Sequence, residues 1–255
     1  MSVSIYGSGN VAWHLAQACI SNGIKIDSII GRNTVDVNEI ATISKAKPIT
    51  SNKFKIYSDI LIIAVADNAI ENVSQLLINK LGKNCIVAHT SGSTSSDVLN
   101  QHNNYGIFYP LQTFTKGQPV VYSDLPFCIS GNSTSVVNKL KLIAGKISKH
   151  IHEIDDAQRL NIHLGAVVIN NFINHLIYKS EEYLKSSNIS PEILQPLLKE
   201  TILKQSRTSS FEAQTGPARR NDTETINKHL KMLNQDIDLQ KIYATISESI
   251  KHSYE

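Results

Sequence analysis

The sequence is poor in the residues that hold metals or form disulfide bonds. Its 255 residues include three cysteines, which lie far apart at Cys19, Cys85 and Cys128 and form no Cys-x-x-Cys pair. An odd, dispersed set of this kind excludes a disulfide framework and a structural zinc site. The nine histidines are scattered as well, without the spacing of a catalytic metal centre. We therefore expect no metal.

Long apolar runs and a strong charge of one sign are also missing. The longest clean apolar run, Ile60 to Ala66, is far shorter than the roughly 20 residues that cross a bilayer. The N-terminus shows no basic segment followed by a long apolar one, so no signal peptide is expected. A net charge of +3 is too small to indicate nucleic acid or an anionic membrane as partner. These observations predict a cytoplasmic protein that binds neither nucleic acid nor a membrane.

The first 155 residues instead alternate short apolar runs with amphipathic stretches. Such runs are typical of parallel strands buried on both faces. The alternation predicts an α/β fold with a doubly wound sheet. The expected strands are 3–6, 26–30, 60–65, 86–89, 106–109, 127–130 and 151–154.

After residue 155 the pattern becomes helical. Apolar residues recur at helical spacing over 157–187, and Ser190-Pro191 is typical of a helix start. Asn221 or Asp222 is expected to cap a third helix, and a fourth runs to the C-terminus. We therefore expect two domains, a dinucleotide-binding domain over 1–155 and an all-α domain over 156–255.

A glycine motif, Gly7-Ser8-Gly9-Asn10-Val11-Ala12, follows the first expected strand and opens the first helix. Its first glycine permits the tight turn, its second lets the backbone approach a pyrophosphate, and Ala12 allows close helix packing. The free amides and the helix dipole there favour an anion. The motif predicts a Rossmann-type dinucleotide site; the alternative is an ordinary turn without a ligand.

The end of the second strand indicates which dinucleotide binds. An NAD site places a carboxylate there, but Asp27 stands inside the apolar run, which continues to Ile30. Arg32 and Asn33 stand at the tip instead. A guanidinium suits a 2′-phosphate, so the sequence favours NADP. The alternative is a solvated arginine in a loop.

Two further strand ends are expected to line the cofactor site, because ligands of such sheets lie beyond the carboxyl ends of the strands. One ends in Val65-Ala66-Asp67, and the next in His89-Thr90-Ser91. We expect the second turn to touch the nicotinamide or the substrate, with Ser91 as a candidate catalytic group. The alternative is a turn whose serine and threonine only bond locally.

Five segments, GSGNVA, DILIIAVAD, HTSGS, FYPLQTF and TGPARRND, occur in that order before or within the helical half. With them, the whole chain resembles a family of bacterial Rossmann-like proteins with a C-terminal helical domain of unknown function, labelled NADP oxidoreductases. It is more distantly similar to pyrroline-5-carboxylate reductase and to 3-hydroxyisobutyrate and 6-phosphogluconate dehydrogenases. The resemblance implies NADP, a small-molecule substrate and a homodimer formed through the helical domain.

The resemblance also points to catalytic candidates. Tyr109 stands where the family usually has histidine, and its hydroxyl could still donate a hydrogen bond. The hydroxyacid dehydrogenases carry Lys-x-x-x-Asn on the first long helix. Here the lysine position is occupied by Ala166, counted from Asn170, or by Val167, counted from Asn171. His163 shares a helix face with Asn170 and is a plausible proton donor. The alternative is a histidine and an asparagine that bond only to each other or to backbone.

Substrate-binding candidates come from the remaining two motifs. Gln112 lies in FYPLQTF, and Arg219 and Arg220 lie in TGPARRND. The arginine pair could bind a substrate carboxylate or a cofactor phosphate. The alternative is a solvent-exposed pair between a Gly-Pro break and the next helix cap.

Three functions fit the residues. The first is an NADP-dependent oxidoreductase that acts on a small carbonyl, hydroxy acid or imine. The second is a non-catalytic dinucleotide-binding sensor or regulatory protein, which the missing lysine and Tyr109 favour. The third is an assembly protein built on the helical half, against which the glycine motif argues. The substrate, and a deazaflavin as redox partner, stay open.

Overall fold

A computed structural model describes residues 1–51 and 53–255. The chain forms two compact units, Met1–Asn171 and Phe172–Glu255. The first unit holds the sheet and the second is helical, and each is described by itself.

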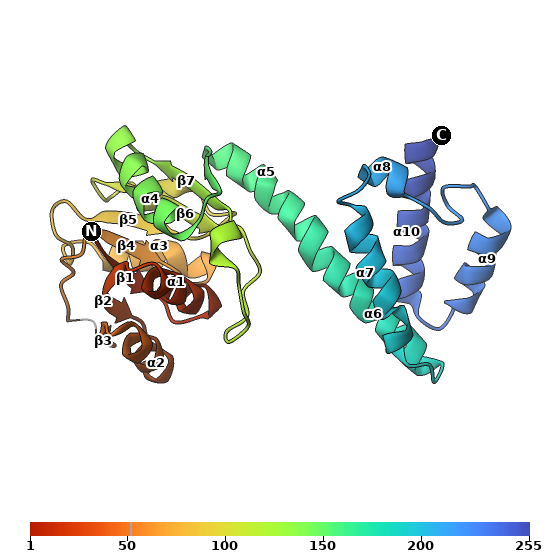
Figure 1. The fold of residues 1–255 in the computed structure, drawn as a ribbon, viewed down its shortest axis with the longest axis horizontal. Coiled ribbons are helices and arrows are strands. Elements are labelled where there is room, and N and C mark those ends of the chain that lie inside the picture. Colours follow the sequence, from red (N-terminus) through yellow and green to blue (C-terminus); the bar gives the residue numbers. More distant parts are fainter. Residues whose placement is uncertain (52) are drawn as a thin grey trace. The chain divides into compact units, whose positions relative to one another are not determined.

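The described strands of the first unit form one eight-stranded sheet in the order β3-β2-β1-β4-β5-β6-β7-β8 (Figure 1). Neighbours pair in parallel, except that β6 and β7 are antiparallel. This confirms the α/β, doubly wound Rossmann-type sheet. The strands are β1 Ser2–Tyr6, β2 Lys25–Ile30, β3 Lys47–Ile49, β4 Ile60–Ile63, β5 Ile86–His89, β6 Tyr105–Pro110, β7 Phe127–Gly131 and β8 Ile151–Glu153.

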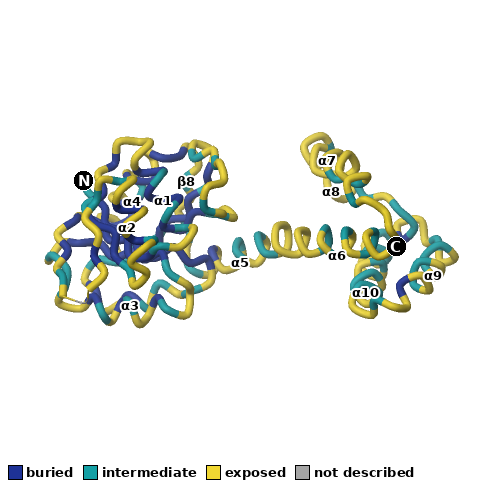
Figure 2. Tube along the Cα trace, turned by 90° about the horizontal axis from the view of Figure 1, so that it is seen from below, coloured by how far each residue is buried: buried dark blue, intermediate teal, exposed yellow. Residues whose placement is uncertain are grey.

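Helices cover both faces of this sheet because its strand residues alternate between two apolar layers. Ile60 and Ile62 of β4 join the core beneath three helices, α1 Asn10–Ser21, α2 Thr34–Ser44 and α4 Thr134–Ile147. Leu61 and Ile63 join the opposite core with α3 Ile70–Leu76 and the short η2 Ser96–Leu99. Figure 2 shows the strands as the buried centre of this unit. The carboxyl ends of β1, β2, β4, β5 and β6 therefore lie along one edge.

A long helical run follows the sheet. It consists of α5 Asp156–Ala166, a π-helical segment Val167–Phe172 and α6 Ile173–Ser186. Asp155 caps α5 through a capping box with Gln158. Ile162 of α5 packs against the sheet cluster of Ile107, Tyr109 and Cys128. The expected change at residue 155 thus coincides with the start of α5, whereas the compact sheet unit extends to Asn171.

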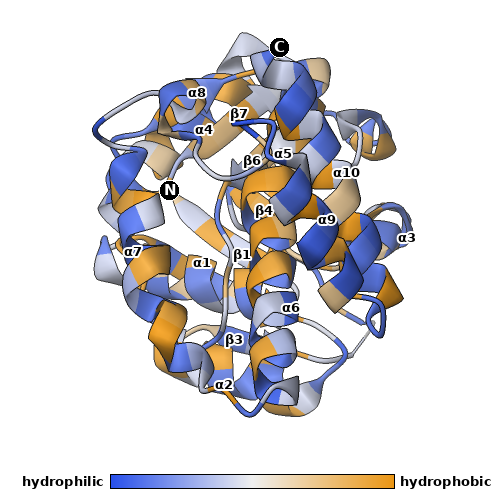
Figure 3. Cartoon of the chain, turned by 90° about the vertical axis from the view of Figure 1, so that its right-hand side faces the viewer, coloured by the Kyte–Doolittle hydropathy of each residue, from blue (hydrophilic) through white to orange (hydrophobic). Residues whose placement is uncertain are grey.

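The second unit is helical throughout its described residues, which confirms the all-α second half. Beyond α6 it contains η5 Pro191–Leu194, α7 Gln195–Lys204, α8 Ser210–Ala213, α9 Thr223–Met232 and α10 Ile237–Tyr254. Of the two expected caps, Asp222 caps α9 by accepting a hydrogen bond from Thr225 N. Only Ala218 and Leu233 are buried among its described hydrophobic residues. Apolar and polar residues alternate along its helices (Figure 3).

By length and composition alone, the 31-residue helical run Asp156–Ser186, which contains an 18-residue window with a mean hydropathy of 1.2, could cross a membrane. The apolar runs of the sequence did not indicate this, because its apolar residues are interspersed with polar ones. The criterion is weak evidence, since helices that pack on other protein surfaces also meet it. The first turns of the run bond to the sheet unit, as shown below.

Candidate functional site

The glycine turn joins β1 to α1 at the carboxyl edge of the sheet. Gly7 has φ +139°, and a Cβ there would lie 2.0 Å from the carbonyl oxygen of Ala64. Only glycine fits this position. A Cβ on Gly9 would meet nothing within 4 Å, and no side chain caps α1 at this residue. The open space and the uncapped amides leave the start of α1 available to an anionic ligand.

The turn opens into a cleft of about 1060 Å³ at the ends of β1, β2 and β4. Its size and glycine-built wall suit a dinucleotide. The cleft brings together most of the predicted cofactor residues, includes Asn68 next to the predicted Val65-Ala66-Asp67 segment, and adds Tyr6 and Asn72, for which no sequence motif gave a signal. The predicted residues that line it are Gly7, Ser8, Gly9, Asn10, Val11, Arg32, Asn33, Val65 and Ala66. Ala12 is buried beneath the turn, and Asp67, His89 and Thr90 are not among the described lining residues.

The end of β2 carries the residues that were expected to select the dinucleotide. Arg32 is exposed, and Asn33 caps α2 by accepting hydrogen bonds from Val35 N (3.1 Å) and Asp36 N (3.3 Å). Tyr6 and Arg32 both line the cleft; burial raises the pKa of Tyr6, and the Arg32 charge offsets part of that effect.

Asp27 lies away from the cleft. Its carboxylate accepts a hydrogen bond from Ser2 Oγ and pairs with Lys25 Nζ at 2.8 Å, at the amino-terminal ends of β1 and β2. It therefore faces the opposite edge of the sheet from the glycine turn. This is consistent with the interpretation that no ribose-binding carboxylate ends β2.

The turn after β5 is held together from within. His89 is fully buried; its Nδ1 accepts a hydrogen bond from Ser91 N (3.2 Å), and its Nε2 lies 3.4 Å from Ser95 O. Burial lowers the pKa of His89 to about 4. Ser91 Oγ accepts hydrogen bonds from the backbone amides of Ser93 (3.1 Å) and Thr94 (2.9 Å). In this structure the side chains of both candidates, His89 and Ser91, form hydrogen bonds within the turn.

This turn also connects two parts of the site. Ser93 Oγ donates a hydrogen bond to Asp67 Oδ2 (2.7 Å), next to Ala66 of the dinucleotide cleft. On its other side, a Cβ on Gly92 would lie 2.4 Å from His163 Nδ1 and 2.8 Å from Tyr109 Cζ. The turn therefore lies between the cleft and the Tyr109–His163 pair.

Tyr109 and His163 face a second pocket of about 670 Å³ in the sheet unit. The Tyr109 hydroxyl lies 3.2 Å from His163 Nδ1, and burial raises the pKa of Tyr109 to about 12. Gln112 and Asn170 line the same pocket, as does Asn171, whose Oδ1 accepts from Asn170 Nδ2 at 3.4 Å. The structure thus brings together four predicted residues, His163, Tyr109, Asn170 and Gln112; Ser91 is not among the described lining residues.

The arginine pair belongs to the second unit. Arg219 Nη1 donates hydrogen bonds to the carbonyl oxygens of Glu212 (3.1 Å) and Gln214, and its guanidinium lies 4.9 Å from the ring centre of Tyr254. These contacts already use Arg219 within its own unit. Arg220 is exposed.

The chain is similar to proteins of this architecture. Residues 125–250 match the family model described as DUF2520, a domain of unknown function. A structure described as "putative NADP oxidoreductase" from Bacteroides fragilis is 33% identical, covers 98% of both chains and has a TM-score of 0.92. A reductive aminase from Aspergillus terreus in complex with NADPH and ethyl levulinate is 12% identical, with a TM-score of 0.70 over 99% of this chain and 93% of that one.

A pyrroline-5-carboxylate reductase from Coxiella burnetii is 14% identical, with a TM-score of 0.60 over 99% of this chain and 97% of that one. A search of curated protein sequences gave no match. The fold and the glycine-built cleft define a Rossmann-type protein. The chain belongs to the family of the Bacteroides fragilis protein and carries the DUF2520 domain, which confirms the resemblance seen in the sequence.

Proposed function

We propose that this protein is an NADP-dependent oxidoreductase that transfers a hydride to or from a small carbonyl, hydroxy acid or imine. The observation that carries the proposal is the Tyr109–His163 pair, which the 89–95 turn places beside the dinucleotide cleft. When bound, the nicotinamide supplies or accepts the hydride. The NADP in the description of the Bacteroides fragilis relative, and the NADPH in the aminase structure, support this cofactor.

The residues of the cleft would hold the cofactor by its charges. The amides at the start of α1 would bind the pyrophosphate, and Gly9 leaves room for it. Arg32 would bind the 2′-phosphate, as a guanidinium binds phosphate with two parallel hydrogen bonds. This supports NADP rather than NAD as the cofactor.

The Tyr109–His163 pair would carry the proton. With a pKa of about 12, the Tyr109 phenol keeps its proton at neutral pH, and its oxygen would accept a hydrogen bond from Nδ1–H of His163. That bond leaves His163 Nε2 to exchange a proton with the substrate. Gln112 and Asn170 line the same pocket and would bind polar groups of the substrate. Of the arginine pair in the helical unit, Arg219 is engaged by backbone carbonyls, which leaves Arg220 as the candidate for binding an anionic group.

The test is a screen of NADPH oxidation against cyclic imines, keto acids and aldehydes. We expect turnover with at least one class. His163→Gln should lower kcat by about 100-fold or more, the usual contribution of a general acid, with an unchanged Kd for NADPH. Wild-type kcat in a His163→Gln protein would remove that residue from the mechanism.

A sensor without catalysis is the second candidate. The observation that favours it is the pocket wall, where Ala166 and Val167 stand at the possible positions of the dehydrogenase lysine. Tight NADPH binding with no turnover in any class of the screen would establish this function in place of the first.

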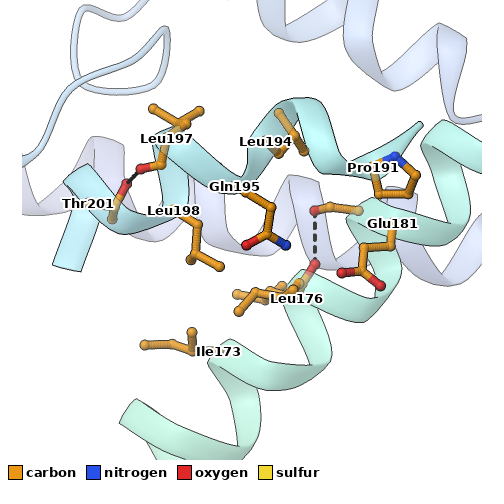
Figure 4. Close-up of a pocket in the computed structure, with 11 residues that line it drawn as sticks. Ile173, Leu176, Glu181, Pro191, Leu194, Gln195, Leu197, Leu198 and Thr201 are labelled. Carbon is orange, nitrogen blue, oxygen red and sulfur yellow. Dashed lines mark hydrogen bonds between the residues drawn. The ribbon is translucent and has the colours of Figure 1, made fainter. Parts of the chain in front are cut away.

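We also propose that the partner of the helical unit is a second copy of the chain. Large apolar side chains are exposed on this unit, with Ile193 at 69% and Leu197 at 64%. Next to them, an apolar groove lies between α6 and the η5–α7 segment and is lined by Ile173 and Leu176 of α6 and Leu194 of η5 (Figure 4). Covering such surfaces is favourable by about 25 cal/mol per Å².

Light scattering of the purified protein tests this pairing. We expect a dimer, and we expect Leu197→Glu to shift it toward monomer. Leu142→Glu, at a 58% exposed position on α4 of the sheet unit, is the matched control. A monomeric wild type contradicts the proposal. We place the protein in the cytoplasm, where its three free, buried thiols would stay reduced.

A further inference from the structure

Arg159, on the first turn of α5, has one of the most buried side chains of the protein. Its side chain is 2% exposed, Nη1 lies 2.5 Å from Asp156 Oδ1, and Nη2 donates a hydrogen bond to the carbonyl oxygen of Thr94. Nε is buried and has no hydrogen-bond partner among the described residues. No sequence motif pointed to this residue, because arginine near a helix start is usually solvated.

Asp156 extends the contact to the same turn. Its Oδ2 accepts hydrogen bonds from Ser96 N (2.6 Å) and Ser95 Oγ (3.0 Å). Together, Asp156 and Arg159 bind three consecutive residues, Thr94, Ser95 and Ser96, that follow β5. We call these contacts the α5 clamp.

The clamp is not needed to start the helix. Asp155 and Gln158 already form a complete capping box at the N-terminus of α5. Burying a guanidinium costs several kcal/mol of desolvation, which its ion pair offsets only in part when one nitrogen has no partner. We therefore explain the burial of Arg159 by the placement of α5 that it fixes, and not by a gain in folding stability.

The geometry that the clamp sets is that of the proposed proton carrier. His163 follows Arg159 by four residues, so both project from one face of α5. His163 packs against Gly92 and Tyr109, and Gly92 belongs to the turn that Arg159 holds at Thr94. The helix thus contacts the turn at two points one helical turn apart.

We propose that Arg159, held by Asp156, is a positioning residue that fixes α5 on the 89–95 turn so that His163 Nδ1 stays within hydrogen-bond distance of the Tyr109 hydroxyl. The catalytic consequence rests on the proposed oxidoreductase function. The placement itself does not, and it is measured without turnover.

The test records the imidazole nitrogen resonances of the full-length protein by NMR, with His163 assigned from the His163→Gln variant. In Arg159→Met we expect the His163 resonances to move toward those in Tyr109→Phe, where the hydrogen bond is absent. Arg159→Lys, which keeps the charge, should restore them in part. Lys141→Met, which removes the exposed Lys141–Glu153 pair (2.6 Å) of the same unit, is the control and should leave them unchanged.

Asp156→Asn is the second variant, because Arg159→Met could fail to fold. It keeps an oxygen for Ser96 N but loses the charge that faces Arg159. Each variant is first shown to bind NADPH with wild-type affinity. Unchanged His163 resonances in a folded Arg159→Met or, if that does not fold, in Asp156→Asn overturn the proposal.

A substrate found in the screen adds an independent readout. Arg159→Met should then lower kcat by about 10- to 100-fold, the effect of a misplaced group, with little change in KM. If the resonances move but no substrate class is turned over, the positioning role stands and the proposed enzymatic function fails.

Discussion

The hydroxyl oxygen of Tyr109 lies 3.2 Å from Nδ1 of His163, although 54 residues separate them in the chain. One residue ends β6, and the other lies on α5. Both pack against Gly92, where a side chain would overlap the two rings. Tyr109 also packs in the apolar cluster of Ile107 and Cys128.

Gly92→Ala should disrupt this pair. The added methyl would lie 2.4 Å from His163 Nδ1, so the imidazole must move away from the Tyr109 hydroxyl. We expect kcat to fall by about 100-fold with unchanged NADPH affinity, and a crystal structure to show the displaced ring. Gly82→Ala, whose Cβ would meet only Ile56 O at 3.7 Å, is the control. An intact Tyr109–His163 bond in Gly92→Ala would contradict the packing argument.

The two glycines of the dinucleotide turn should fail in different ways. Gly7→Ala places a methyl 2.0 Å from Ala64 O at φ +139°, and we expect it to lower the free energy of unfolding by about 2–4 kcal/mol. Gly9→Ala meets nothing within 4 Å and should leave stability unchanged while weakening NADPH binding. Urea denaturation and a fluorescence titration separate the effects. Equal free energies of unfolding for the two variants would refute the conclusion that Gly7 is sterically required and Gly9 is not.

His89 should make the protein sensitive to acid. Burial lowers its folded pKa from 6.5 to about 4, so the folded state favours the neutral ring. The resulting stability is present above pH 6.5 and is lost as the pH falls toward 4. At 1.36 kcal/mol per unit, the loss is about 3 kcal/mol. Between pH 7 and 4, the free energy of unfolding measured by urea denaturation should decline more steeply for wild type than for His89→Asn. Parallel curves for the two proteins would contradict this prediction.

Arg32 should discriminate between the two nicotinamide dinucleotides. Charge-assisted hydrogen bonds contribute about 1.5–3 kcal/mol, so Arg32→Ala should weaken NADPH binding by about 10- to 100-fold and leave NADH binding unchanged. Lys25→Ala, at the opposite end of β2, is the control for loss of one positive charge. Equal weakening for both dinucleotides would show that Arg32 does not recognise the 2′-phosphate.

Local patterns were sufficient to predict the fold class and the dinucleotide turn. Apolar runs bounded by turns identified seven of the eight described strands, and β3 escaped because it spans only Lys47–Ile49. The turn was predictable because a strand, a glycine pair and a helix follow one another directly in the chain. The place of Asp27 was predictable for a similar reason. Asp27 stands inside the apolar run, and the sequence therefore indicated that it does not lie at the carboxyl end of β2.

The sequence by itself therefore determined the α/β sheet, the helical second half and the glycine turn, since each depends on neighbouring residues. Tertiary structure decided which polar residues meet. It engaged His89 and Ser91 in their own turn, brought His163 to Tyr109, and buried Arg159 against Thr94. These contacts join residues from different elements, and their partners are set by how the elements pack, which no local pattern encodes.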